Sequence, residues 1–257
     1  MVKLCLLTGI LSCCFMYSFS QVEKIDTDRP DQTESAVTVP KNWIQLELGM
    51  SKQENKPGSY EFQHPTLLSK YGISNRIEFR LITTLSTITF YDSSGIKQKV
   101  SGLLPVELGA KISLWEEKNF IPKTSLLFHV AFPKLASEKL SADKLAPNFR
   151  FSMQHTVSKS VAIGYNIGAE WDGYNNVPVW IYTFAPGFNI GEKWYSYIEV
   201  FGFISKQDEP QHSIDGGIAY FVNSNFKLDL SSGFGISKTA PDWYVAIGGS
   251  IRFKARK

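Results

Sequence analysis

The residues of this chain that could do chemistry are few and far apart. Its histidines are spread over 257 residues, and they are His64, His129, His155 and His212. The pair His212-Ser213 would suggest hydrolysis, yet a serine nucleophile needs a histidine within hydrogen-bond reach and a third group that orients it. Neighbouring residues of a strand point to opposite faces. The sequence also lacks metal-ligand spacing and a phosphate-binding loop. We therefore predict no catalytic site, no metal and no cofactor.

A second group, the charged residues, recurs at every second position of otherwise apolar segments. This spacing places charges on one face of a strand and apolar side chains on the other. We predict that the following line the lumen of a barrel: Glu47, Glu78, Arg80, Glu107, Lys111, Arg150, Glu170, Glu199, Asp215, Lys227, Asp229 and Arg252. Acidic and basic residues are too mixed for a strongly ion-selective pore. Two roles stay open: paired charges that hold the interior shut, or a lining that selects a solute.

Long strands must position these charges, and residues 212–237 show such strands best. Apolar residues such as Ile214, Ile218, Leu228 and Leu230 alternate there with small or polar ones. The two arms have about a dozen residues each, and Asn223-Ser224-Asn225 joins them as a turn. Strands of soluble proteins usually have ~5–6 residues, whereas about 9–11 tilted residues cross a bilayer. The hairpin is therefore typical of a membrane-spanning barrel.

The chain from Trp43 onward repeats this pattern, and we predict about twelve strands. The turns expected to be short are 74–75, 116–119, 158–160, 191–193 and 223–225. The loops expected to be longer are 51–59, 91–101, 134–147, 172–177, 207–211 and 238–242. Outer-membrane barrels have short periplasmic turns and longer outer loops, and an even number of strands. This alternation favours that class and places both ends of the barrel sequence in the periplasm.

The tryptophans give an independent indication, because all of them fall at expected strand ends. In the predicted topology Trp43, Trp115 and Trp194 lie at the periplasmic rim. The other three, at the outer rim, are Trp171, Trp180 and Trp243. Such girdles are typical of membrane barrels, because the indole ring favours the membrane–water interface.

The segment before the first strand divides into two parts. Residues 1–20 predict a cleaved signal peptide, because Lys3 precedes an uncharged apolar run that ends in small residues. All three cysteines lie in this segment, so the mature chain is expected to contain none. Residues 21–42 are polar and predict an extended periplasmic arm or plug, and residues 43–257 predict the barrel. The mature net charge of 26 − 24 = +2 is too balanced to indicate a nucleic-acid partner.

Four stretches of the chain resemble a known family. They are Thr27–Ser35, Trp43–Gly49, Tyr71–Glu78 and His212–Ser237. Their residues, order and spacing are similar to the outer-membrane proteins named for the meta-pathway of phenol degradation. The resemblance implies an outer-membrane barrel that moves small, often aromatic, compounds. The tail after Phe253 departs from the usual pattern, in which the last strand ends on the aromatic residue itself.

Together these observations predict an all-β protein, a closed antiparallel up-and-down transmembrane β-barrel in the outer membrane of a Gram-negative bacterium. The predicted function is passive passage of small molecules, aromatic or hydrophobic ones among them. The alternatives are a sealed structural barrel without transport and, less favoured, an outer-membrane lipid hydrolase. The expected partners are outer-membrane lipids and a small-molecule solute, with no nucleic acid. The expected assembly is a monomer or a small homo-oligomer.

Overall fold

The structure is a computed structural model that describes residues 24–55 and 58–255. The predicted signal peptide, residues 1–20, lies outside the described residues, as do residues 21–23 of the predicted arm. The described chain is almost entirely strand, with two short 3₁₀ turns, η1 (Pro133–Leu135) and η2 (Glu138–Leu140). No helix in residues 24–55 and 58–255 has the length and apolar character needed to cross a membrane.

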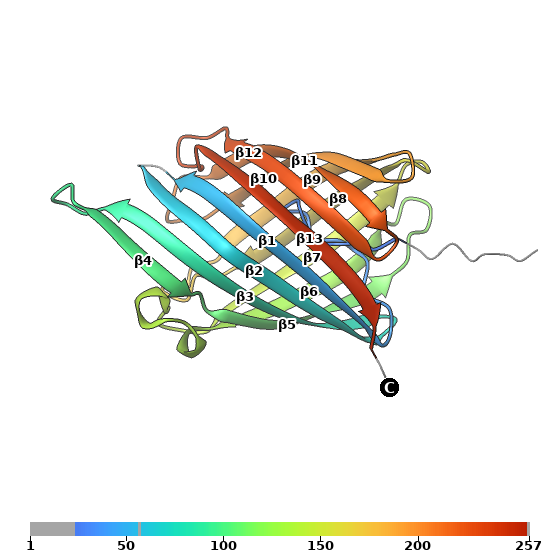
Figure 1. Ribbon diagram of the computed structural model, residues 1–257, viewed down its shortest axis with the longest axis horizontal. Coiled ribbons are helices and arrows are strands. Elements are labelled where there is room, and N and C mark those ends of the chain that lie inside the picture. The colour runs from blue at the N-terminus through green and yellow to red at the C-terminus, as the bar shows by residue number, and fades with distance from the viewer. Residues whose placement is uncertain (1–23, 56–57, 256–257) are drawn as a thin grey trace, which may run out of the picture.

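The strands follow one another around a single antiparallel sheet (Figure 1). They are β1 (Trp43–Asn55), β2 (Ser59–Ser74), β3 (Ile77–Tyr91), β4 (Lys97–Leu103), β5 (Val106–Trp115), β6 (Lys123–Phe132), β7 (Ala146–Thr156), β8 (Val161–Glu170), β9 (Val179–Ile190), β10 (Trp194–Ile204), β11 (Gln211–Asn223), β12 (Phe226–Gly235) and β13 (Trp243–Lys254).

The sheet closes because β1 pairs with β2 on one side and with β13 on the other. The β1–β13 register runs from Trp43 opposite Lys254 to Glu54 opposite Trp243. Closure matters in a membrane, since an open edge would leave backbone N–H and C=O groups without partners in hydrocarbon, at a cost of several kcal/mol each. The predicted closed antiparallel barrel is confirmed.

The described chain has thirteen strands, but the circumference of the barrel is twelve strands, because β4 and β5 both pair with the same edge of β3, one after the other. The outer half of β3 pairs with β4, and its other half pairs with β5. The interruption falls at Pro105, which has no backbone N–H to donate to the sheet. The backbone between β4 and β5 nevertheless stays beside β3, because the Leu104 N–H donates to the Thr84 carbonyl at 2.9 Å.

Several predicted connections were wrong. Residues 97–101, expected in a loop, belong to β4, and β1 continues to Asn55 through most of the expected loop 51–59. The connection 116–122 is longer than the expected turn 116–119. The alternation of short and long connections is therefore less regular than predicted. For β1 and β4 the cause is that their outer parts carry polar residues on both faces, which hides the period of two while the backbone still pairs.

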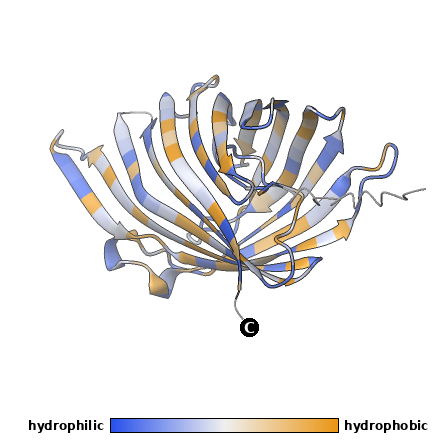
Figure 2. Cartoon of the chain, turned by 45° about the vertical axis from the view of Figure 1, so that its right-hand side comes forward, coloured by the Kyte–Doolittle hydropathy of each residue, from blue (hydrophilic) through white to orange (hydrophobic). Residues whose placement is uncertain are grey.

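The distribution of side chains is the reverse of that in a soluble protein. Large apolar side chains such as Ile218, Leu228 and Leu230 are about half exposed on the outer surface, whereas Gln45 and Glu47 are only 1% exposed. The hydropathy colours alternate along the strands accordingly (Figure 2). An apolar outer wall around a polar interior is stable where lipid, not water, surrounds the barrel.

The tryptophans lie at the two rims, as predicted. At one rim Trp43 and Trp194 begin strands and Trp115 ends one. At the other rim Trp243 begins β13, Trp180 is the second residue of β9 and Trp171 directly follows β8. With these rings at the interfaces, the strands between them span the membrane.

Residues 24–42 do not join the sheet but enter the barrel as an arm (Figure 1). The arm has no helix or strand, and Ile25, Ala36 and Val39 are buried. Because a buried backbone must find hydrogen-bond partners, an arm without secondary structure requires acceptors and donors from the wall.

Candidate functional site

The wall supplies these acceptors through side chains that point inward. Carboxylate oxygens of Glu47 accept from the backbone N–H groups of Asp28 at 3.0 Å and Arg29 at 3.1 Å. In the same way Glu78 accepts from the Val39 N–H at 2.7 Å, and Glu199 from the Gln32 N–H at 2.7 Å. Charged hydrogen bonds of this kind are stronger than neutral ones. The predicted interior carboxylates thus hold the arm in an extended path.

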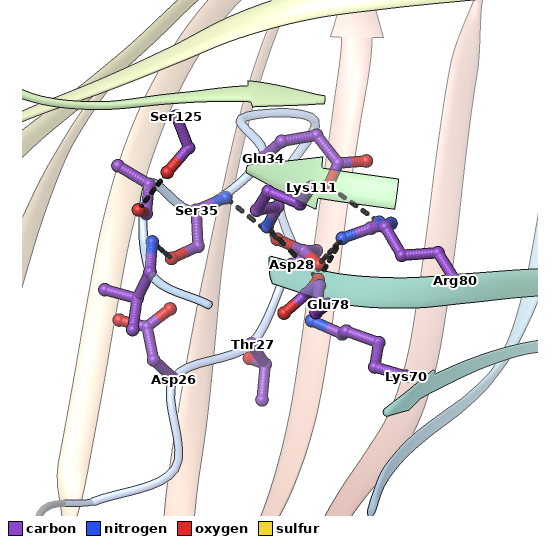
Figure 3. Close-up of polar contacts among 12 residues, drawn as sticks. Asp26, Thr27, Asp28, Glu34, Ser35, Lys70, Glu78, Arg80, Lys111 and Ser125 are labelled. Atoms are coloured by element: carbon purple, nitrogen blue, oxygen red, sulfur yellow. Dashed lines mark hydrogen bonds and ion pairs between the residues drawn. The ribbon is translucent and has the colours of Figure 1, made fainter. Parts of the chain in front are cut away.

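Asp28 is the centre of the largest ion cluster, which lies on the β2–β5 side (Figure 3). Its carboxylate contacts Lys70, the Arg80 guanidinium at 2.8 Å and the Lys111 ammonium at 2.9 Å. Burial opposes ionisation, but Lys111, Lys70 and Arg80 together hold the pKa of Asp28 well below its usual 3.8. The Ser35 N–H also donates to this carboxylate at 2.9 Å. The Asp28 side chain therefore stabilises a turn within the arm and links the arm to three strands.

Arg80 joins this cluster to the rest of the interior. Its guanidinium contacts Glu78 at 3.0 Å, Glu34 of the arm at 3.0 Å, and His129 Nε2 at 2.9 Å. Burial, which outweighs the attraction of Arg80, raises the pKa of Glu34. With Lys70, Glu78 and Lys111, Arg80 packs this side of the lumen with paired charges.

Arg29 links the arm to the opposite side of the barrel. Its Nη2 lies 2.9 Å from the Asp229 carboxylate on β12. The guanidinium lies over two glycines, since a Cβ at Gly49 would come within 2.0 Å of Arg29 Nη1 and one at Gly248 within 2.5 Å of Nε. A side chain at either position would displace the guanidinium from the place where it meets Asp229.

The β10–β11 side carries carboxylates with fewer counter-charges. Glu199 and Asp215 lie directly opposite each other on neighbouring strands. Thr33 donates to Glu199 at 2.6 Å, and the Tyr244 hydroxyl bonds Asp215. Burial within the barrel and the neighbouring Glu199 carboxylate raise the pKa of Asp31 well above its usual 3.8. This side of the interior therefore favours positive charge.

The other predicted lumen residues also face inward. Arg150 lies 3.8 Å from Glu170 and donates to the Gln32 carbonyl at 3.1 Å. Glu107 accepts from the Asn148 amide at 3.2 Å. Lys227 contacts Thr27 and donates to the Arg29 carbonyl at 2.8 Å, and Arg252 donates to Asn225 at 3.1 Å. Whether these residues act on a solute stays a prediction.

The sequence reading missed Lys70 and Asp28. Lys70 lies on β2, where Pro65 and a shift in register interrupt the alternation. Asp28 lies in the arm, where no period of two exists. An interior position for Lys70 follows only from its place in the sheet, since it pairs with Gln45 on β1 and Arg80 on β3. Arg29 of the arm also lies among the lumen charges, through its contact to Asp229.

The His212-Ser213 pair does not form a nucleophile and base. His212 Nδ1 lies 2.9 Å from the Tyr182 hydroxyl, whereas Ser213 is buried on the opposite face of β11. Among residues 24–55 and 58–255, no group of three or more histidine, cysteine or carboxylate side chains is arranged to hold a metal ion.

A cavity of about 490 Å³ lies between the arm and the inner faces of the strands from β7 to β12. Residues 24–36 of the arm line one side, and small wall residues such as Ala162, Gly164 and Ala185 line the other. Ser160 and Gly191 of the short turns border it as well, so the cavity lies toward the rim that the topology places in the periplasm. The space thus remains on the side of the lumen away from the Asp28 cluster.

A closed barrel with an apolar outer wall, tryptophan rims and a charged interior is an outer-membrane β-barrel, which contacts membrane lipids. The chain belongs to the family described as "Putative MetA-pathway of phenol degradation", which matches residues 27–253. No curated protein matches the chain.

Solved structures show the same fold. An outer membrane channel from Pseudomonas putida F1 is similar with a TM-score of 0.67 and 9% identity, over 90% of this chain and 100% of that chain. The KdgM porin is similar with a TM-score of 0.54 and 10% identity, over 81% and 99% of the two chains. The NanC porin gives a TM-score of 0.51 and 10% identity, over 81% and 98%. At such identities these likenesses establish the fold.

Proposed function

We propose that this barrel lets small solutes cross the outer membrane passively. The observation that carries the proposal is the cavity of about 490 Å³ between the arm and the wall of a closed barrel, which leaves room for a small molecule inside the lumen. Ligand sites of proteins commonly have ~300–1,000 Å³, so the cavity suits a small molecule. The similar solved structures are a channel and porins, and the family name associates such barrels with aromatic compounds.

The route in this proposal follows the inner faces of β7 to β12. The opposite side, around Asp28, is filled with ion pairs that would resist passage. The arm narrows the remaining lumen, so passage of anything larger requires the arm to shift. Because the closed barrel encloses its own lumen, one chain supplies a complete route, and a small homo-oligomer would carry several routes in parallel.

The second candidate is a sealed barrel whose role is structural. The same ion cluster favours it, because buried pairs such as Asp28–Arg80 hold the arm on several strands at once. In that case the cavity would be a closed vestibule and the arm a permanent plug. The two candidates differ in one measurable property, the permeation of solute.

Liposome swelling and planar-bilayer conductance test the proposal. We expect the folded protein to admit small solutes at rates that fall with solute size, and to give discrete current steps. Protein that has been unfolded by heat, recognised by its changed mobility on a gel, is the control. No swelling with any solute and no current at any voltage, from protein with folded mobility, would establish the sealed barrel instead.

A further inference from the structure

The cavity has two aromatic walls, and a positive charge already lies near the face of each. Lys24 Nζ lies 4.9 Å from the centre of the Phe221 ring, and Lys227 Nζ lies 6.0 Å from that of Tyr195. Both rings and both lysines border the cavity. An ammonium group within about 6 Å of a ring centre is attracted by the negative face of the ring. Each ring thus already has a lysine ammonium group near its face, and the rings are left to contact the apolar part of a ligand.

Three of the four basic side chains at the cavity are engaged by other groups, and the fourth, Lys159, is exposed in the short turn after β7. Arg29 is paired with Asp229, Lys227 contacts Thr27 and the Arg29 carbonyl, and Lys24 donates to the Glu192 carbonyl. Arg29, Lys227 and Lys24 keep their positive charges, but their N–H groups donate to protein oxygens. Few of these donors are therefore available to an incoming anion.

Asp31 is a carboxylate at the cavity that has no ion-pair partner among residues 24–55 and 58–255. It is half-buried and borders the cavity. Within the described part of the chain, no lysine, arginine or histidine nitrogen lies within ion-pair distance of it. Its strongest electrostatic neighbour is another carboxylate, Glu199, and Lys227 offsets that repulsion only in part. Binding of a positive charge beside Asp31 would relieve this repulsion.

We propose that the cavity binds small organic cations, with a primary ammonium group beside Asp31 and the apolar body against Tyr195 and Phe221. This inference rests on the proposed function and deepens it, because it gives the solute a chemical class. An anion would be repelled by Asp31, and a neutral molecule of equal size would lack the attraction of Asp31.

Three probes of nearly equal size and shape separate the possibilities: benzylammonium, benzyl alcohol and benzoate. Binding of each to the full-length folded protein in detergent is measured by calorimetry, which needs no permeation. We expect benzylammonium to bind at least about tenfold more tightly than either of the others. Asp31→Asn should weaken benzylammonium about tenfold and leave benzyl alcohol nearly unchanged. Asp208→Asn, the same charge change in an exposed loop, should leave all three unchanged.

A second variant tests whether Asp31→Asn weakens binding only because it disturbs the structure of the arm. Tyr195→Leu keeps the carboxylate but removes the ring against which the apolar body packs, and it should also weaken benzylammonium several-fold. Benzoate or benzyl alcohol binding as tightly as benzylammonium would overturn the inference, as would equal benzylammonium affinity in Asp31→Asn and the wild type. Binding of benzylammonium without any solute permeation would refute the proposed channel function but not this inference. Permeation of solutes without any preference for the ammonium probe would refute this inference but not the proposed channel function.

Discussion

Asp28→Asn is the substitution that should release the arm most effectively. It removes the negative charge that Lys70, Arg80 and Lys111 share while keeping the shape of the side chain. All three cations are at most 2% exposed at their side chains, so they cannot recover the lost interaction from water. Breaking a buried ion pair costs about 3–5 kcal/mol. At about 1.4 kcal/mol per tenfold change in population, the released arm should become about 10²–10⁴ times more populated.

Cysteine labelling measures this population directly. The cysteines of the sequence all lie in the predicted signal peptide, so a single Ala36→Cys would be the unique thiol of the mature protein. Ala36 is 1% exposed when the arm is docked. Its labelling by a maleimide should therefore proceed through the released state. In the Asp28→Asn background we expect the labelling rate to rise by up to the same factor of about 10²–10⁴.

The control is Asp92→Asn, which removes the same charge from an exposed turn between β3 and β4, where Asp92 bonds only near neighbours such as Gln98. It should leave the labelling rate of Ala36→Cys unchanged. Both variants must keep the heat-dependent gel mobility of the folded barrel. If labelling in folded Asp28→Asn stays within twofold of the parent, the ion cluster does not hold the arm and the reasoning is refuted.

Three further results are expected. The raised pKa of Asp31 means that the docked arm binds this proton more tightly than the released arm does. Docking should therefore weaken as pH rises through the raised value and strengthen as pH falls toward 3.8, and labelling rates should follow; an unchanged pH profile in Asp31→Asn would contradict this. Gly49→Ala should displace the Arg29 guanidinium and speed arm release, whereas Gly249→Ala, whose nearest neighbour would be 3.2 Å away, should not; equal labelling would count against the role of Arg29. Ile218→Arg, on the lipid face, should lower barrel stability by about 2–4 kcal/mol in urea titrations in lipid, and no loss would place this residue outside the hydrocarbon.

The sequence alone determined the barrel wall. Alternation with a period of two is a local property, so Ile218 and Asp229 could be assigned to opposite faces without knowing which strands pair. The tryptophans at strand ends placed the rims for the same reason. Polar strand ends such as β4 were the exception, because neither of their faces meets lipid along its whole length and the pattern fades.

The tertiary structure alone decided what fills the barrel. Asp28 meets Lys70, Arg80 and Lys111 from three strands, at separations of 42, 52 and 83 residues. No local pattern encodes such a meeting, because it depends on closure of the sheet and on the path of an arm without secondary structure. The sequence supplied a list of inward charges of both signs. Only their arrangement in space shows which of these charges are neutralised. It alone also shows that the remaining space lies beside Asp31.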